Sequence, residues 1–320
     1  MLDKFGREID YLRISVTGNC NLNCIYCTPD KSETSGANCR DYLTATEIGT
    51  VTAAMAKLGI KKVRITGGEP LLRPDLEEII GNIATITGIT EIAMTTNGIG
   101  LAERAEQLKS AGLKRVNISI DSLENDKFAW ITGGGNLACV LKGIHSVVRT
   151  GLTPVHLNVV VIKGINDNEI DRFVELTRDN PVDVRFIELM PIGDFGRNYT
   201  DHVVFNRDII AARPELQAVQ DDSWKQPANY YRMSGYCGQI GFISPLSHKF
   251  CAFCNRIRLT CEGTLKPCLG DNQEIDLVPV LRHEPEKLEW YIQKAIFRKP
   301  ASHHFEQSYV SKRNMAAIGG

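Results

Sequence analysis

The chain has 320 residues, of which 43% are hydrophobic, and its formal net charge is −1. This size allows one large domain or one domain with a substantial extension, and the near-neutral charge gives no sign of nucleic-acid or membrane binding. No apolar run reaches the roughly 18 residues of a membrane-spanning helix. The first residues carry no signal core, so we expect a cytoplasmic protein.

Short runs rich in Val, Ile and Thr recur from residue 10 to residue 191 and predict six strands. They are Tyr11–Val16, Lys62–Gly67, Glu91–Asn97, Arg115–Asp121, Val155–Lys163 and Asp183–Met190. The segments between them carry apolar residues at helical spacing, such as Ile48, Val51 and Met55. The predicted helices are Ala45–Leu58, Asp75–Ile86, Ala102–Ala111, Leu137–Arg149 and Asn168–Arg178. Asn166 or Asp167 is expected to cap the last of them.

Strands that alternate with helices are expected to pair in parallel. Both a doubly wound sheet and an incomplete barrel fit this pattern, and in each the functional residues lie at the carboxyl ends of the strands. The alternation stops after Pro191. Two β-like runs, Tyr230–Met233 and Gln239–Ile243, and a helix-like stretch, Pro285–Phe297, follow it. We therefore predict a first domain over residues 1–191 and a second over residues 192–320.

Six of the ten cysteines fall into two tight groups, and clustered cysteines in a reducing compartment more often hold metal than form disulfides. The first group, Cys20, Cys24 and Cys27, has the spacing C-x3-C-x2-C directly after the first strand. Three thiolates leave one iron of a 4Fe–4S cluster open to a small molecule. The alternative is a zinc site that takes a fourth ligand from elsewhere.

The second group is Cys251, Cys254 and Cys268 in a C-x2-C-x13-C arrangement. Spacing alone slightly favours zinc here, with Cys261 or Cys237 as the fourth ligand. Arg256 and Arg258 lie inside the motif, and a structural zinc site does not require them, whereas guanidinium groups suit phosphate or a purine edge. The remaining cysteines, Cys39, Cys139, Cys237 and Cys261, are otherwise expected to be buried apolar side chains.

The first motif, with the aromatic Tyr26 before its last cysteine, resembles that of the radical S-adenosylmethionine (SAM) superfamily. The run ITGGEP ends the second strand, and its Gly67, Gly68 and Glu69 resemble the segment that binds the SAM amino group there. Glycines allow such close backbone approach. By the same resemblance Ser119 and Met190, at later strand ends, are expected to meet SAM.

The resemblance becomes specific over nearly the whole chain. The segments CNLNCIYC, KKVRITGGEPLLRPDL, VRFIELMPIG, GFISPLSHKFCAFCNRIRLTCEGTLKPCL and RNMAAIGG resemble the GTP 3′,8-cyclase family. This family resemblance implies an incomplete (β/α)6 barrel closed by a C-terminal α+β region that carries a second 4Fe–4S cluster. It implies an enzyme that uses SAM to cyclise GTP in molybdenum cofactor biosynthesis. It also implies an external electron donor, a partner that converts the product to cyclic pyranopterin monophosphate, no nucleic acid or membrane partner, and a possible homodimer.

Residue by residue, the resemblance implies that GTP meets a set of cationic and polar side chains. They are Arg13, Arg64, Thr95, Arg256, Arg258 and His156. His156 stands where the family usually has a lysine, so we expect a pH-dependent contact there. The tail residues Gly319 and Gly320 are implied to enter the active site with Arg313, which makes all three candidate catalytic residues.

Overall fold

The computed structural model describes residues 1–27, 42–198, 200–219, 226–305, 311, 313 and 315–319. All six predicted strands are confirmed, with ends that differ by no more than two residues. They are β1 Tyr11–Ser15, β2 Lys62–Thr66, β3 Glu91–Thr96, β4 Arg115–Ser119, β5 Val155–Val161 and β6 Val182–Glu188. Within this part of the chain no helix is both long and apolar enough to cross a membrane.

The five predicted helices are confirmed as α1 Ala45–Lys57, α2 Leu76–Ala84, α3 Leu101–Ala111, α5 Leu137–Thr150 and α6 Ile170–Asp179. Apolar periodicity forms them, since Ile48, Val51 and Met55 of α1 are all buried. One further helix, α4 Asn125–Thr132, was not predicted. The predicted cap of α6 is wrong, because the side chains of Asn166 and Asp167 bind backbone groups outside that helix.

The C-terminal part adds short elements to both edges of the same sheet. Its strands are β7 Gln217–Ala218, β8 Ala228–Arg232, β9 Ile240–Ile243, β10 Arg256–Leu259, β11 Thr264–Lys266 and β12 Ile275–Asp276. Its helices are α7 Gly193–Asn198, α8 Asn206–Ala211, α9 Val278–His283, α10 Leu288–Phe297 and α11 Met315–Ile318. The predicted last helix therefore starts as a 3-10 turn, Pro285–Lys287, and continues as α10.

The described strands form one open sheet in the order β12-β11-β10-β1-β2-β3-β4-β5-β6-β9-β8-β7. From β10 to β9 all neighbours are parallel, and both ends of the sheet are antiparallel. Because β1 to β6 keep their chain order without a reversal, the doubly wound alternative is wrong.

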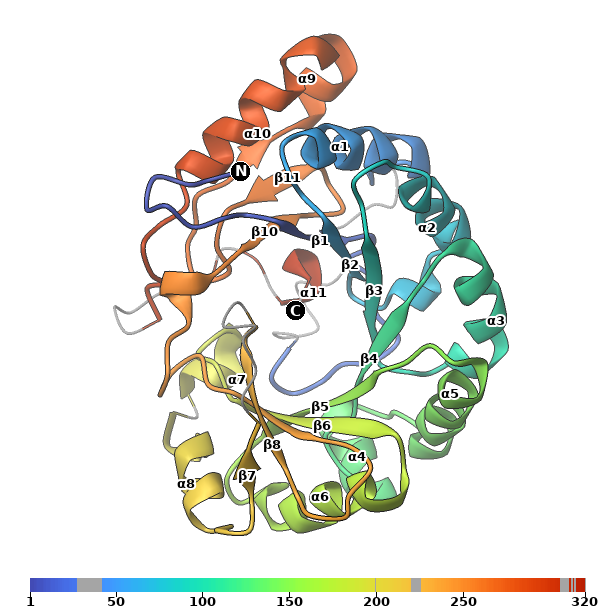
Figure 1. Ribbon diagram of the computed structural model, residues 1–320, viewed down its shortest axis with the longest axis vertical. Helices are drawn as coiled ribbons and strands as arrows, with labels where there is room; N and C mark the ends of the chain where they lie inside the picture. The colour runs from blue at the N-terminus through green and yellow to red at the C-terminus, as the bar shows by residue number, and fades with distance from the viewer. Residues whose placement is uncertain are drawn as a thin grey trace.

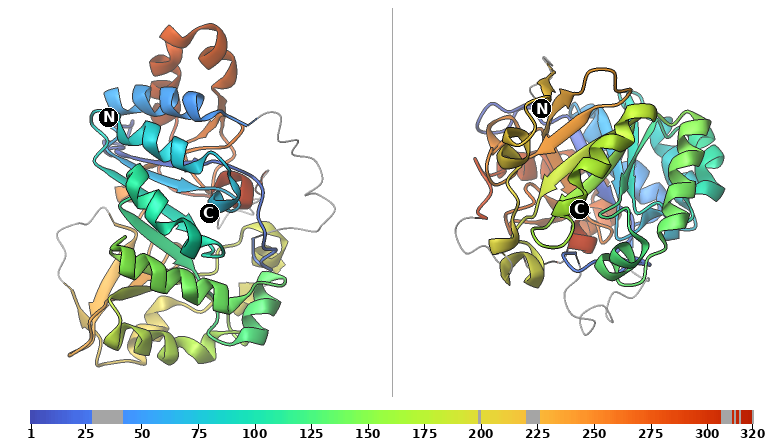
Figure 2. Two further views of the ribbon diagram at one scale, coloured as in Figure 1. Left: turned by 90° about the vertical axis from the view of Figure 1, so that its right-hand side faces the viewer. Right: turned by 90° about the horizontal axis from the view of Figure 1, so that it is seen from below.

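The sheet curves around α11, which lies near its centre, while α1, α2, α3, α5 and α6 cover the outside (Figure 1). Viewed from the right-hand side of Figure 1, these helices lie in chain order across the outer face of the sheet (Figure 2, left). Alternate strand residues face the two sides. In β1, Leu12 and Ile14 are buried in the core, whereas Tyr11 and Arg13 line the inner side.

Candidate active site

A cavity of about 1080 Å³ is lined by residues from every strand from β1 to β6 and from the C-terminal part. Fifteen of the predicted site residues line it. They are Arg13, Cys20, Cys24, Tyr26, Cys27, Arg64, Gly67, Gly68, Glu69, Thr95, Ser119, His156, Met190, Arg256 and Arg258. The second cysteine group, Arg313 and Gly319 are not among its lining residues, although Asn255 and Leu269, next to Cys254 and Cys268, are. Gly320 lies outside the described residues.

The first cysteine group follows β1, and two of its members lie in one turn, in which the Cys27 amide donates to the Cys24 carbonyl. Burial raises the pKa of the Cys24 thiol well above its ordinary value, and Cys27, Asp121 and Cys20 raise it further. A buried thiol beside other thiols is stabilised as a thiolate by a bound positive centre. Their chemistry therefore fits a bound iron–sulfur group.

The second cysteine group begins at the 3-10 turn Cys251–Phe253, just before β10. Burial would raise the pKa of the Cys254 thiol, but Lys299 and Arg256 outweigh it and lower that pKa to about 7. The pKa of Cys268 is raised by burial, with Lys299 acting against it. A poised thiolate of this kind is suited to metal ligation.

Among the described residues, no three His, Cys, Asp or Glu side chains form a group that would hold a single metal ion. For the second group the choice between zinc and a 4Fe–4S cluster stays a prediction.

The four other cysteines differ in their surroundings. Cys261 is buried as predicted, and Cys139 is half-buried. Cys237 is exposed, so its predicted burial is wrong: it lies in the turn between β8 and β9, where its amide donates to the Arg178 carbonyl. Cys39 lies outside the described residues.

The Gly67–Glu69 loop packs directly against the segment before the first cysteine. The Gly68 amide donates to the Thr17 carbonyl at 2.6 Å, and the Glu69 amide donates to the Asn19 carbonyl at 2.7 Å. A Cβ atom on Gly68 would collide with the Asn19 carbonyl. The loop therefore requires glycine because two backbone segments meet here without room for a side chain.

Glu69 is fully buried, and burial raises its pKa to about 7. Its carboxylate accepts hydrogen bonds from the Leu71 amide, the Thr96 hydroxyl and the Asn97 amide. These contacts join the ends of β2 and β3. The side chain predicted to contact SAM therefore also fixes the loop that carries Gly67 and Gly68.

Replacing Gly68 with alanine is expected to lower the yield of folded, iron-loaded protein severely, because the new methyl group overlaps the Asn19 backbone. The matched control is Gly81→Ala in α2, where an added Cβ meets nothing within 4 Å. There alanine is expected to stabilise the helix by up to about 1 kcal/mol. Thermal unfolding and iron content measure both variants, and equal behaviour would contradict the packing argument.

Two side chains that sequence reasoning missed contact the first cysteine loop. The Tyr26 hydroxyl donates to Asp121 at 2.5 Å, and burial raises the pKa of Tyr26 well above its ordinary value. The side-chain amide of Asn97 donates to the Asn21 side-chain carbonyl at 2.8 Å, and its nitrogen lies 4.0 Å from the Cys20 sulfur. Asn97 directly follows β3 and Asp121 follows β4 after one residue, and this place at strand ends is the signal that could have identified them.

Arginines lie next to one another across three parallel strands. Arg13 of β1 is in register with Arg64 of β2 on one side and with Arg258 of β10 on the other. Burial lowers the pKa of Arg13 well below its ordinary value, and Arg258 and Arg64 lower it further. Burial and Arg256 lower the pKa of Arg258 to about 10. Adjacent like charges are unfavourable without a counter-charge, so this row is suited to bind an anion.

Contacts within the cavity orient members of this row. Arg64 donates to the Tyr11 hydroxyl and to the Thr95 hydroxyl, the latter at 3.4 Å. The predicted Thr95 therefore lies beside the arginine row.

His156 lies across the cavity between two arginines that sequence reasoning missed. Its Nδ1 is 3.3 Å from Arg115, and its Nε2 is 3.2 Å from Arg185 and 3.2 Å from the Asp183 carboxylate. Burial lowers the pKa of His156 to about 3, with the Asp183 carboxylate acting against it and Arg185 and Arg115 acting in the same direction as burial. The imidazole is therefore neutral near pH 7, and the two arginines carry the positive charge at this position.

This histidine gives a testable pH dependence. Between about pH 3 and pH 6.5 the unfolded chain protonates His156 and the folded chain does not, so this group makes stability rise with pH. Glu69 acts oppositely, because its raised pKa makes stability fall from pH 4.5 to about 7. The pH dependence of the free energy of unfolding must therefore be compared between the wild type and a His156 variant. We expect His156→Gln to lose less stability than the wild type on acidification, and parallel unfolding curves against pH would contradict it.

The tail reaches the arginine row. The carbonyls of Ile318 and Gly319 accept hydrogen bonds from Arg258. Gly319 is buried with φ of 71°, and a Cβ there would collide with the Thr66 hydroxyl. Two features therefore require glycine at position 319, its left-handed backbone and its contact with β2.

Arg313 lies further back along the tail. Its Nε is 3.0 Å from Glu274, and its guanidinium also binds Glu262 at 2.5 Å. These contacts anchor the tail to the C-terminal part. They give no support for the predicted direct catalytic role of Arg313, which stays a prediction.

Two family models match the chain in succession. Residues 14–177 match the radical SAM superfamily, and residues 182–305 match Molybdenum Cofactor Synthesis C. Among solved structures, Streptococcus suis SuiB bound to S-adenosylmethionine has a TM-score of 0.62 at 14% identity, covering 91% of this chain and 68% of that one. Native anSMEcpe with bound AdoMet has a TM-score of 0.56 at 14% identity, covering 92% and 82%. The chain is thus a radical SAM protein, and these structures share its fold.

Relatives with full-length similarity identify the family within the radical SAM superfamily. The GTP 3′,8-cyclase of Alkaliphilus oremlandii is 48% identical over 322 aligned residues, with the whole of both chains covered. That of Peptoclostridium acidaminophilum is 46% identical and covers 100% of this chain and 98% of its own. The chain belongs to the GTP 3′,8-cyclase family.

Proposed function

We propose that the protein converts GTP to (8S)-3′,8-cyclo-7,8-dihydroguanosine 5′-triphosphate with SAM and a reductant, the first step of molybdenum cofactor biosynthesis. The relatives of this name support the proposal. One observation carries it: a single cavity is lined both by the first cysteine group with its glycine loop and by the arginine row. A radical generated at one side therefore meets an anionic substrate held at the other without leaving the protein.

We propose that β1 to β6 and their helices, within residues 1–191, form an incomplete (β/α)6 barrel. Residues 192–320 close it and carry a second 4Fe–4S cluster at Cys251, Cys254 and Cys268. The chain order of the strands and the pairing of β9 and β10 with the two edges support this division of roles.

At the SAM side, Cys20, Cys24 and Cys27 would hold a 4Fe–4S cluster, which with bound SAM supplies the 5′-deoxyadenosyl radical. The chain's own contribution is position. The Gly67 and Gly68 backbone and Glu69 would bind and orient the SAM amino group. Tyr26, Ser119 and Met190 line the same cavity and would contact the rest of SAM.

At the substrate side, positive charge would hold the triphosphate and the purine. Arg13, Arg64, Arg256 and Arg258 supply guanidinium groups that converge on the cavity, with Thr95 beside them. Fixed cations in a site that excludes water bind phosphate oxygens strongly. His156 would contact GTP as a neutral donor or acceptor, with Arg115 and Arg185 in the role of the missing lysine. The tail residues Gly319 and Gly320 would complete the wall.

We further propose the partners that this reaction requires. An external electron donor would reduce the first cluster, and a cyclic pyranopterin monophosphate synthase would receive the product. Thiols used as ligands need a reducing compartment, which supports a cytoplasmic enzyme. A homodimer stays a prediction from the family resemblance.

The test is anaerobic incubation of the iron-loaded protein with GTP, SAM and a strong reductant. The expected products are 5′-deoxyadenosine and cyclised GTP in equal amounts, measured by liquid chromatography and mass spectrometry. Cleavage of SAM that leaves GTP unchanged would refute the substrate while leaving the class of enzyme in place.

A further inference from the structure

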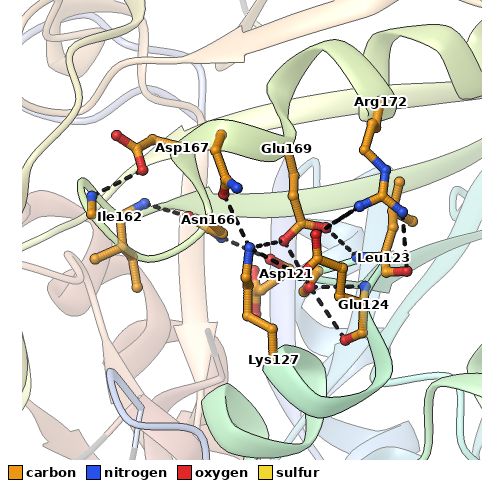
Figure 3. Close-up of polar contacts among 12 residues, drawn as sticks. Asp121, Leu123, Glu124, Lys127, Ile162, Asn166, Asp167, Glu169 and Arg172 are labelled. Atoms are coloured by element: carbon orange, nitrogen blue, oxygen red, sulfur yellow. Dashed lines mark hydrogen bonds and ion pairs between the residues drawn. The ribbon is translucent and has the colours of Figure 1, made fainter.

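A polar network connects residues after the ends of β4 and β5 with residues near the starts of α4 and α6 (Figure 3). Asp121 is its member nearest the cavity and is 2% exposed. One carboxylate oxygen accepts from the Tyr26 hydroxyl at 2.5 Å, and the other accepts from the Val160 amide at 2.8 Å. Asp121 thus ties the side chain of the cysteine loop to β5.

The second support of the cysteine loop is the carboxyl end of α4. The Ile25 amide donates to the Ile131 carbonyl at 2.9 Å, and the Asn23 amide donates to the Thr132 carbonyl at 2.9 Å. The loop is therefore held at its backbone by α4 and at its Tyr26 side chain by Asp121.

Residues 122 and 123 lie between these two supports, and Glu169 binds both of them. Glu169 is 0% exposed. One of its oxygens accepts from the Ser122 hydroxyl at 2.8 Å, and the other accepts from the Leu123 amide at 2.7 Å. A single carboxylate therefore fixes the short connection from Asp121 to α4.

The charge of Glu169 is balanced from the outside of the network. Lys127 lies 2.9 Å from one oxygen, and Arg172 lies 3.6 Å from the other. A buried charge without partners would destabilise the fold. The two cations offset this cost, so Glu169 can stay ionised while it is buried. As a carboxylate, Glu169 offers a separate acceptor oxygen to each of the two donors, whereas an amide in its place would turn an NH2 donor toward one of them.

We propose that Glu169, remote from the cavity, is a positioning residue for SAM chemistry: it holds the connection between Asp121 and α4, and thereby both supports of the first cysteine loop. This inference rests on the proposed function for the role of that loop in binding SAM. We call the two hydrogen bonds from Ser122 and Leu123 to Glu169 the brace, and these bonds exist whether or not SAM binds to the loop. Groups that orient metal ligands from behind affect affinity and activity even though they touch neither metal nor substrate.

The chain supplies a matched control in Glu124. Its carboxylate binds the same two cations, Lys127 at 3.4 Å and Arg172 at 2.8 Å, but its side chain is 45% exposed. Within the described residues it makes no side-chain hydrogen bond to Ser122 or Leu123. Glu124→Gln therefore changes the same charge environment without loosening the brace.

The test compares Glu169→Gln with Glu124→Gln by amide hydrogen exchange of residues 20–27 in the metal-free protein. We expect Glu169→Gln to speed exchange of this segment roughly tenfold and, after iron loading, to weaken SAM binding roughly tenfold. Glu124→Gln should match the wild type in both. Because the exchange is measured without iron, SAM or GTP, it tests the brace even if the proposed function fails.

Equal exchange in the two variants would overturn the proposal. If Glu169→Gln does not fold, Ser122→Ala removes one of the same two hydrogen bonds and must speed exchange of residues 20–27. Unchanged exchange in that variant would also overturn it. A readout on KM separates positioning from chemistry, since KM for SAM should rise while the wild-type ratio of 5′-deoxyadenosine to cyclised GTP is kept.

Discussion

Replacing Cys24 with serine is expected to abolish SAM cleavage, because a hydroxyl does not replace the thiolate as a ligand to iron. The Cys24 thiol is the one whose pKa is raised most clearly by burial and by its two neighbours in the group. It therefore depends most on the bound cluster for its charge. Iron content should fall from about eight to about four atoms per chain, and 5′-deoxyadenosine should not form.

Cys268→Ser is the matched variant in the second group. It should lose a similar amount of iron but retain some SAM cleavage without cyclised GTP, because this group lies near the arginine row. Cys237→Ser, an exposed cysteine outside both groups, should behave like the wild type. Equal loss of SAM cleavage in Cys24→Ser and Cys268→Ser would contradict the division of roles between the two groups.

Replacing Arg13 with methionine is expected to weaken GTP binding by about 100-fold, because a fixed cation in the middle of the row is lost. The same change should stabilise the protein without GTP by about 1 kcal/mol, because the repulsion from Arg258, Arg64 and Arg256 disappears. A site that binds anions is thus expected to hold its charges at the expense of stability.

The measurement for this second prediction is thermal unfolding with and without GTP. The wild type should gain stability from GTP, and Arg13→Met should start from a higher unfolding temperature and gain much less. Arg207→Met is the control, since that side chain is 70% exposed and lies outside the cavity. A lower unfolding temperature for Arg13→Met in the absence of GTP would contradict the electrostatic reasoning.

Local sequence patterns predicted the elements of the first 191 residues well, because strand and helix periodicity is a property of neighbouring residues. They did not predict that β10 pairs with β1, because the paired residues Tyr11 and Arg256 are about 245 positions apart in the sequence. Such pairing depends on the whole fold. Asn166 shows the same limit, since its side chain binds the Asp121 and Val160 carbonyls instead of capping a helix.

The residues of the site also fall into those that a local motif predicts and those that only the fold reveals. The cysteines and the glycine loop belong to compact motifs, so the sequence identified them and the structure brings the first group and the loop together at one cavity. Glu169 and Arg185 carry no local signal, because each acts through partners that lie far away in the sequence. Their burial and contacts, which appear only in three dimensions, are what distinguish them from ordinary surface charges.

The pairing of β10 with β1 has a consequence for how the polypeptide matures as it leaves the ribosome. The outer edge of the first strand stays open until residue 256 has emerged, so most of the chain exists for a time with an unprotected strand edge. The edge of β6 likewise waits for β9. A fragment ending near residue 191 would keep both edges bare and should aggregate, whatever the quality of its hydrophobic core.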